Sequence, residues 1–186
     1  MIELPAPVTN SLDTLRSMQR RYAQDEHRPL AGYATLMTLY LGATAGLMAV
    51  ARGREEAAKI STRDLVLITV ATHRLARTLT KDAIASPLRA PFTQYAGPGG
   101  PGELHEEVAD WAHGHPIAHA VGELVTCPFC LAQWIATTLT GAHVLAPTVA
   151  RLLTTVLTAV AGADALQYVY AGLQSIEIRG VDQRDD

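Results

Sequence analysis

The distribution of charge constrains this chain most, because it leaves two long stretches almost without charged side chains. Pro29–Ala51 contains none. As a helix this stretch would be roughly 34 Å long, enough for a bilayer core of ~30 Å. Between Leu124 and Ile176 the charged residues are Arg151 and Asp164. This second stretch is too long for one membrane span, so we expect it to divide.

Pro147 and Arg151 mark the natural division of the second stretch. We predict two helices, about Leu131–Ala146 and Leu152–Leu173, joined by a short turn as a helical hairpin. Asp164 would then lie in the middle of the second helix. A carboxyl group there is costly in lipid, so it should face another helix.

Composition excludes a disordered chain, because the chain has enough apolar residues to form a buried core. Apolar residues make up 48% and charged residues 18%, low against ~25% in typical soluble domains. A net charge of −3 argues against a nucleic-acid partner. Ala and Thr make the charge-poor stretches only moderately hydrophobic, so a soluble helical bundle is the alternative to a membrane protein. Met1–Asn10 lacks the pattern of a signal peptide, so internal spans would act as uncleaved anchors.

Shorter patterned segments surround the charge-poor stretches. Ser11–His27 predicts an amphipathic helix. Ser61–Asp64 resembles a capping box ahead of a partly charged helix, Leu65–Ile84. Gly97–Gly102 indicates a turn-rich linker, and Glu103–His113 is again interpreted as helical.

The distribution of Lys and Arg predicts the orientation in a membrane, because basic residues favour the cytosolic side. If Leu65–Ile84 does not cross, residues 52–123 and the C-terminus share a side with ten basic residues, against five on the other. If it crosses, the N-terminus, residues 85–130 and the tail share the more basic side. Both arrangements place the segment before Leu131 and the C-terminus in the cytosol, and leave open the side of the N-terminus.

The first chemical candidate is the pair Cys127 and Cys130, separated by Pro128 and Phe129. A C-x-x-C pair is a redox or metal-binding motif. No β-α-β pattern surrounds it, and the chain lacks the second cysteine pair that membrane thiol oxidoreductases usually need. We expect free structural thiols, with redox and metal chemistry as alternatives. Cys130, near a helix N-terminus, should be the more reactive, with Trp134 one turn beyond it.

Histidines precede the cysteine pair. His113 is followed by His115, His119 and Glu123, of which the last three share one face of a helix. The spacing matches no standard zinc finger, and a solvated face opposite Ile117, Val121 and Leu124 is favoured over a metal site. The zinc hypothesis uses four side chains: Cys127, Cys130, His115 and His119.

The third candidate is a set of charges around the partly charged helix: Arg74, Arg77, Asp82 and Arg89. Charges on an otherwise apolar helix need partners, so a structural ion-pair network is favoured over a substrate site. We expect one of the first two arginines to pair inside the bundle with an acid, the options being Asp82, Asp164 and Glu123.

Residues 73–92 and 122–139 together resemble the bacterial integral-membrane family called domain of unknown function 1360. The shared pattern is an Arg-x-x-Arg helix, then an Asp and a Pro/Arg segment, then C-x-x-C with Trp four residues later. The resemblance spans about residues 65–173 and implies membrane residence and a shared structural core, with no catalytic assignment. The matching positions are Arg74, Arg77, Asp82, Arg89, Cys127, Cys130 and Trp134.

These observations predict an all-α fold: a multi-pass transmembrane helical bundle with a C-terminal helical hairpin and short amphipathic helices. The expected parts are an amphipathic segment (1–28), a first transmembrane helix (29–51), a family-like core (61–173) and a polar tail (174–186). We expect a non-enzymatic structural or assembly component of the cell membrane without a cofactor. Its partners would be the lipid bilayer and membrane proteins, complex proteins or further copies of the chain.

Two alternative functions stay open. One is a thiol- or metal-dependent membrane enzyme that uses Cys127 and Cys130. The other is a soluble helical subunit of a larger complex.

Overall fold

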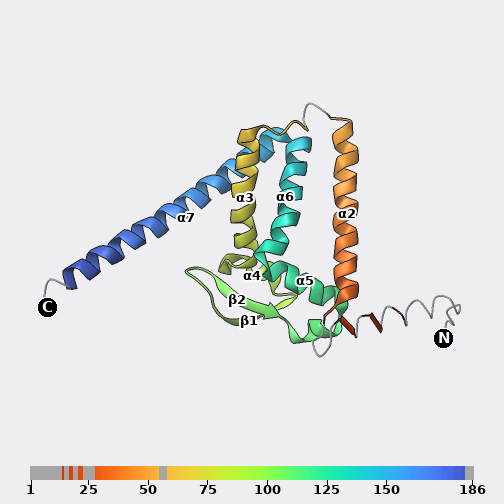
Figure 1. The fold of residues 1–186 in the computed structure, drawn as a ribbon, viewed down its shortest axis with the longest axis horizontal. Coiled ribbons are helices and arrows are strands. Elements are labelled where there is room, and N and C mark those ends of the chain that lie inside the picture. Colours follow the sequence, from red (N-terminus) through yellow and green to blue (C-terminus); the bar gives the residue numbers. More distant parts are fainter. Residues whose placement is uncertain (1–13, 15–16, 19–20, 23–27, 55–57, 183–186) are drawn as a thin grey trace.

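The computed structural model describes residues 14, 17–18, 21–22, 28–54 and 58–182, with no side chains described beyond Ser175. The described part is mostly helical, with one small antiparallel sheet (Figure 1). The predicted amphipathic helix Ser11–His27 lies largely outside the described residues. The elements are α2 (Leu30–Arg52), α3 (Thr62–Thr80), η1 (Ala83–Ala85), α4 (Ser86–Arg89), β1 (Thr93–Pro98), β2 (Leu104–Val108), η2 (Asp110–Gly114), α5 (Pro116–Thr126), α6 (Pro128–Leu145) and α7 (Pro147–Asp182).

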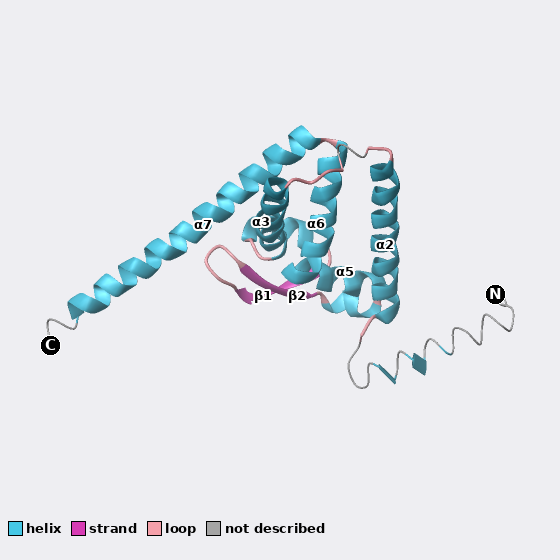
Figure 2. Ribbon diagram, turned by 45° about the horizontal axis from the view of Figure 1, so that its top comes forward, coloured by secondary structure: helices cyan, strands magenta, loops and turns pink. Residues whose placement is uncertain are grey.

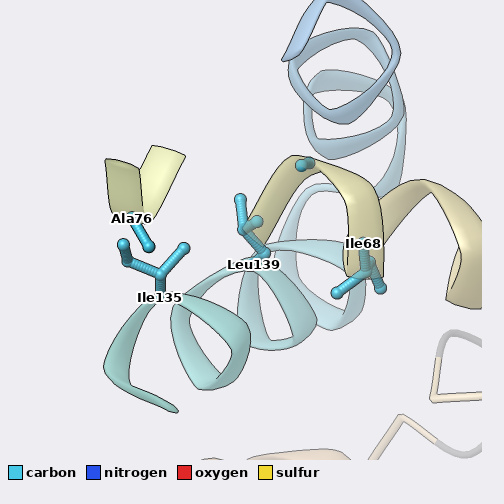
Figure 3. Close-up of a cluster of buried hydrophobic side chains, with 5 residues drawn as sticks. Ile68, Ala76, Ile135 and Leu139 are labelled. Carbon is cyan, nitrogen blue, oxygen red and sulfur yellow. The ribbon is translucent and has the colours of Figure 1, made fainter. Parts of the chain in front are cut away.

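The hydrophobic core lies between α3 and α6, and α7 packs against both helices. Figure 3 shows Ile68 and Ala76 of α3 facing Ile135 and Leu139 of α6. Small residues such as Ala71, which is completely buried, let the two helices approach closely. The N-terminus of α3 confirms the predicted cap, since the Ser61 side chain accepts a hydrogen bond from the backbone N–H of Asp64.

Three polar contacts hold α7 against α3, and we call them the polar ladder. Arg151 binds the Asp64 carboxylate through two hydrogen bonds of 3.0 and 3.1 Å. Thr158 donates to the backbone carbonyl of Leu67, at 3.3 Å. Asp164 lies 3.1 Å from Arg74. Beyond Asp164, α7 runs obliquely away from the other helices (Figure 1), and its described side chains are exposed.

A small extra unit, which we call the foot, lies at one end of the helices and consists of α4, β1, β2, η2 and α5 (Figure 2). Its hairpin pairs Thr93 with Val108 and Pro98 with Leu104. The predicted helical fold is confirmed for most of the described chain, to which this small sheet is an addition that was not predicted. The helix predicted over Glu103–His113 was wrong for Leu104–Val108, which form β2. The acidic segment alternates between exposed and buried positions, which suits a strand.

The Gly/Pro-rich segment, predicted to be a linker, forms the turn of this hairpin. Gly102 adopts a φ of 74°, a conformation that glycine reaches without steric cost. Its carbonyl accepts a hydrogen bond from the backbone N–H of Ala83, and Asp82 forms an isolated bridge with Glu103. The segment therefore ties the hairpin to the end of α3.

The helix α2 docks on the foot rather than on the core. It packs mainly against α5 and only slightly against α6. At the crossing, Gly32 is the buried residue of α2, and a Cβ atom there would lie 2.0 Å from the carbonyl oxygen of Pro116. Glycine is therefore required at this position for α2 and α5 to approach.

The chain turns sharply between α5 and α6, which are bent by 87° at Cys127. The predicted division of the second charge-poor stretch is confirmed at Ala146, but α6 begins at Pro128 and α7 already at Pro147. A proline at the first helical position fits both starts. The helix α7 continues to Asp182, into the segment predicted to be a polar tail.

Within the described residues, two helices are long and apolar enough to cross a membrane: α2 and the Pro147–Ser175 part of α7. The bent pair of α5 and α6 would be a third if it formed one span. The first charge-poor stretch, predicted as Pro29–Ala51, thus corresponds closely to α2.

Candidate functional site

The most deeply buried charge in the described residues belongs to Arg89, whose side chain is 1% exposed. Its guanidinium forms two hydrogen bonds of 2.8 Å with the Glu106 carboxylate. It also donates to the carbonyls of Leu79 and Asp82. This charge-assisted pairing links the foot to the end of α3 and positions β2.

The Glu106 carboxylate is satisfied on every side. Besides Arg89, it accepts hydrogen bonds of 2.9 Å from the hydroxyls of Ser86 and Thr93. The Arg89 guanidinium, with those two hydroxyls, holds the pKa of Glu106 below its ordinary value, although burial opposes the shift. A buried ion pair with this many hydrogen bonds has a structural role, because no donor or acceptor is left for a substrate.

The other two family-motif arginines lie in an open cleft between α3, α7 and the hairpin turn. Arg74 binds Asp82 at 3.1 Å and lies 3.1 Å from Asp164, which confirms that Arg74 pairs inside the bundle. Arg77 pairs instead with Glu103, an acid that was not among the expected partners. The cleft has a volume of about 830 Å³.

The cysteines lie at the turn between α5 and α6 and are both free. Cys127 is the N-cap residue of α6, and its Sγ accepts a hydrogen bond of 3.3 Å from the backbone N–H of Cys130. The partial positive charge at the N-terminus of α6 therefore acts on the sulfur of Cys127. The sequence had predicted this effect for Cys130, as the more reactive thiol.

Cys130 and Trp134 line a second cavity, of about 270 Å³, between α2, α5 and α6; we call it the elbow cavity. Tyr40 meets Trp134 edge to face, with ring centroids 5.2 Å apart, and its hydroxyl lies 2.9 Å from that of Thr137. The remaining lining residues are Tyr33, Leu36, Met37, Ala120, Glu123, Leu124 and Gln133.

Glu123 is the charged group of the elbow cavity. Its carboxylate accepts a hydrogen bond from the Tyr33 hydroxyl. It lies 3.5 Å from the guanidinium of Arg28 and 3.5 Å from the His119 ring. This carboxylate therefore joins α2 to α5, while its side chain stays 30% exposed.

The histidine face is only partly solvated. His113 and His115 are exposed and Glu123 is 30% exposed, as expected for a solvated face. His119 is buried and packs edge to face on His113 of η2, with ring centroids 4.5 Å apart. Ile117, on the opposite face, is 56% exposed.

No group of three or more His, Cys, Asp or Glu side chains in the described part of the chain is placed to hold a metal ion. His115 precedes α5 as its N-terminal flanking residue and contacts the backbone carbonyl of Trp111 at 3.0 Å. The zinc hypothesis thus stays a prediction without support from this geometry.

Sequence reasoning missed Glu103, Glu106 and Tyr33 as partners. The first two were assigned to a helix, which hid that Glu106 lies at the buried position of a strand and faces Arg89. Tyr33 was missed because nothing in a helical pattern indicates which distant acid a tyrosine will bind.

The described residues form a helical protein with two helices that could cross a membrane, a buried ion pair and no recognisable catalytic constellation. The chain belongs to the family described as "Protein of unknown function (DUF1360)", whose model matches residues 67–170. The match covers most of α3, the foot, α6 and most of α7, and includes all seven motif positions. Comparisons with curated proteins and with solved structures gave no match.

Proposed function

We propose that this protein is a multi-pass integral membrane protein with a structural or assembly role rather than an enzymatic one. The observation that carries the proposal is the contrast between the apolar character of α2 and α7 and their lack of burial. The apolar window of α2 is 0% buried and that of α7 is 11% buried by the rest of the described chain. Such surfaces need lipid or protein around them.

The arrangement of the helices supports four segments at membrane depth, namely α2, α3, α6 and α7. The helices α2, α3 and α6 run alongside one another, with the foot at one end (Figure 1). The α2–α3 and α6–α7 connections lie together at the other end (Figure 1). Arg74 of α3 has two acidic neighbours, Asp82 and Asp164. These neighbours lower the free-energy cost of placing the Arg74 charge at membrane depth.

In this arrangement the foot and the start of α2 share one side of the membrane. In this proposal, the sequence assigns eight basic residues to that side (Arg16, Arg20, Arg21, Arg28, Lys81, Arg89, Arg179 and Arg184) and five to the other (Arg52, Arg54, Lys59, Arg63 and Arg151). The more basic side is favoured to be cytosolic. The cysteine pair lies at the same end, at the start of α6. The proposal therefore places the cysteine pair and the C-terminus in the cytosol, at the inner surface of the cell membrane.

A structural role agrees with what the polar groups do. The buried charges bind each other across elements: Arg89 joins α4 to β2, and Asp64 joins α3 to α7. The role in assembly would fall to the exposed apolar faces, which contact lipid, other membrane proteins or further copies of the chain.

Extraction of membranes with alkaline carbonate tests the proposal. We expect the full chain to stay in the membrane pellet and to require detergent for release. Ala43→Arg, near the centre of α2, should prevent stable insertion, because an arginine at the centre of a span costs ~2.5–3.5 kcal/mol on insertion scales. Thr62→Arg, at the end of α3, is the control. Recovery of the unaltered chain in the soluble fraction would refute the proposal.

Thiol labelling tests the orientation, because the chain has two cysteines and both are in the motif. A membrane-impermeant maleimide should label the protein in permeabilised cells but not in intact cells. Labelling in intact cells would reverse the proposed orientation and leave the membrane proposal itself unaffected.

A further inference from the structure

The sharp turn between α5 and α6 sets the direction of α5 in the proposed membrane. The two helices are bent by 87°, so if α6 crosses along the bilayer normal, α5 lies almost parallel to the bilayer surface. Gly122 of α5 faces the hairpin, where a Cβ atom would lie 3.2 Å from Val108. Leu124 faces the elbow cavity between α2 and α6. The helix α5 therefore separates the hairpin from the membrane-spanning helices, as a helix in the plane of the interface would.

Large apolar side chains are exposed where the foot joins the helices, and we call them the apolar rim. They come from η1, α4, α5 and the first turn of α6, and their exposed fractions lie between 56% and 88%. The four segments are neighbours in space, because α4 contacts both η1 and α5, and α5 contacts α6. Exposed apolar groups of this size favour an acyl layer over water. The rim consists of Ile84, Leu88, Ile117 and Phe129.

The segment that carries half of the rim has its one charge turned inward. Between Ala83 and Pro91 the only charged residue is Arg89, whose side chain is 1% exposed and bound to Glu106. An uncharged surface of this kind can enter an acyl layer without the free-energy cost of placing a charge there. The exposed residues of this segment are Ala83, Ile84, Pro87, Leu88, Ala90 and Pro91.

The hairpin side of the foot has the opposite character. Two aromatic residues are exposed there, Tyr95 and Trp111, and each ring carries a polar atom that suits headgroups or water. The foot is therefore amphipathic, with its polar side away from the spans and its apolar side next to them. This segregation, in a unit joined directly to the proposed spans, favours a lipid surface as the partner of the rim. The exposed polar residues of the hairpin side include Gln94, His105, Glu107 and Asp110.

We propose that the apolar rim is embedded in the boundary between headgroups and acyl chains, with α5 lying in the plane of the membrane as an interfacial helix. The rim side chains would lie ~5–10 Å into this boundary, and the hairpin would stay in water. The rim would thereby fix the depth at which α2 and α6 cross. This inference rests on the proposed membrane location, and it assigns α5 to the interface instead of to a span shared with α6.

Site-directed spin labelling of the full chain, in vesicles of phosphatidylethanolamine and phosphatidylglycerol, tests the inference. Cys127→Ser with Cys130→Ala removes both thiols of the chain, and one cysteine at a time is then introduced for a nitroxide label. Collisions of the label with oxygen, which concentrates in the acyl layer, and with a water-soluble nickel chelate report its depth. The rim variants are Leu88→Cys, Ile117→Cys and Phe129→Cys.

We expect the rim labels to collide mainly with oxygen, at a depth of ~5–10 Å. Gln94→Cys and Glu107→Cys, on exposed positions of the hairpin, are the matched controls, and their labels should collide mainly with the nickel chelate. Ala43→Cys, near the centre of α2, reports separately whether the chain has inserted. If one rim variant fails to insert, Ile84→Cys supplies another rim position.

Water-accessible rim labels, in a chain whose Ala43→Cys label lies in lipid, would overturn this inference and leave the membrane proposal standing. That is the result expected if a soluble protein were the natural partner of the rim. Rim labels shielded from both reagents would also overturn the inference, because a second copy of the chain would then cover the rim. A water-accessible label at Ala43→Cys would refute the membrane proposal, and this inference with it.

Discussion

The foot differs from the two apolar helices, α2 and the distal half of α7, in where its side chains find their contacts. In the foot, Arg89 and Glu106 are almost completely buried, and each makes several hydrogen bonds within the chain. The two helices bury almost nothing, and their apolar side chains face outward. The foot therefore carries its own stabilising contacts, whereas α2 and distal α7 depend on what surrounds them.

The largest loss of stability is expected from Arg89→Ala, which removes the buried ion pair of the foot. Glu106 would be left as a buried carboxylate without its guanidinium, and removing one partner of a buried pair costs ~3–5 kcal/mol. The folded yield in detergent should fall severely. Arg77→Ala is the control, because that side chain is 40% exposed and a pair near the surface contributes ~0–1 kcal/mol. Equal losses in the two variants would contradict the distinction between foot and cleft.

Gly32→Ala separates α2 from the foot. The added Cβ would lie 2.0 Å from a backbone oxygen of Pro116, which cannot move without shifting α5. We expect a loss of ~1–3 kcal/mol in the free energy of unfolding, measured by denaturant titration in mixed micelles. Gly42→Ala is the matched control, because a Cβ there meets nothing within 4 Å, and it should be neutral or stabilising. Similar behaviour of both variants would disprove the docking of α2 on α5.

A smaller effect is expected at Cys127, which lies between the foot and α6. Cys127→Ala removes the N-cap acceptor of α6 and should cost ~0.5–1 kcal/mol, at the low end for cap residues because sulfur is a weak acceptor. Cys127→Ser should keep or improve stability, since serine is a preferred N-cap residue. Thermal unfolding in detergent distinguishes the two. If Cys127→Ser were the less stable variant, a role beyond capping would follow.

The smallest effect concerns the far end of the polar ladder. Arg151 forms two hydrogen bonds with the Asp64 carboxylate, but its own side chain is 57% exposed, so we expect the pair to contribute only ~0–1 kcal/mol. Arg151→Gln, which keeps a hydrogen-bond donor, should therefore lower the Tm in detergent only slightly. Arg63→Gln, on an exposed neighbour, should leave the Tm unchanged.

The parts that the sequence predicted correctly depend on local patterns. The absence of charge located α2, and Ser61 ahead of Asp64 located the start of α3. The cost of a charge at depth predicted that Arg74 would pair, and it does. Each of these inferences needs only neighbouring residues or a rule about one side chain.

The parts that were missed depend on contacts between distant segments. The hairpin was overlooked because glycine and proline in its turn resemble a linker, while a five-residue strand gives too few alternations to stand out. The burial of His119 was missed because the histidine face of α5 was interpreted as solvated throughout. His119 packs against His113 of η2, and the periodicity of α5 alone could not indicate that contact.

The lengths of α2 and α7 differ in a way that matters for bilayer thickness. Helix α2 has 23 residues, about 34 Å at 1.5 Å per residue, whereas Pro147–Ser175 has 29, about 43 Å. If α7 crosses the membrane as proposed, its apolar length exceeds a hydrocarbon layer ~30 Å thick, and tilting would accommodate the excess. The oblique course of α7 (Figure 1) has this character. In a thinner hydrocarbon layer we expect α7 to tilt further from the membrane normal, and in a thicker layer to tilt less. In both cases the polar ladder would hold the first half of α7 against α3.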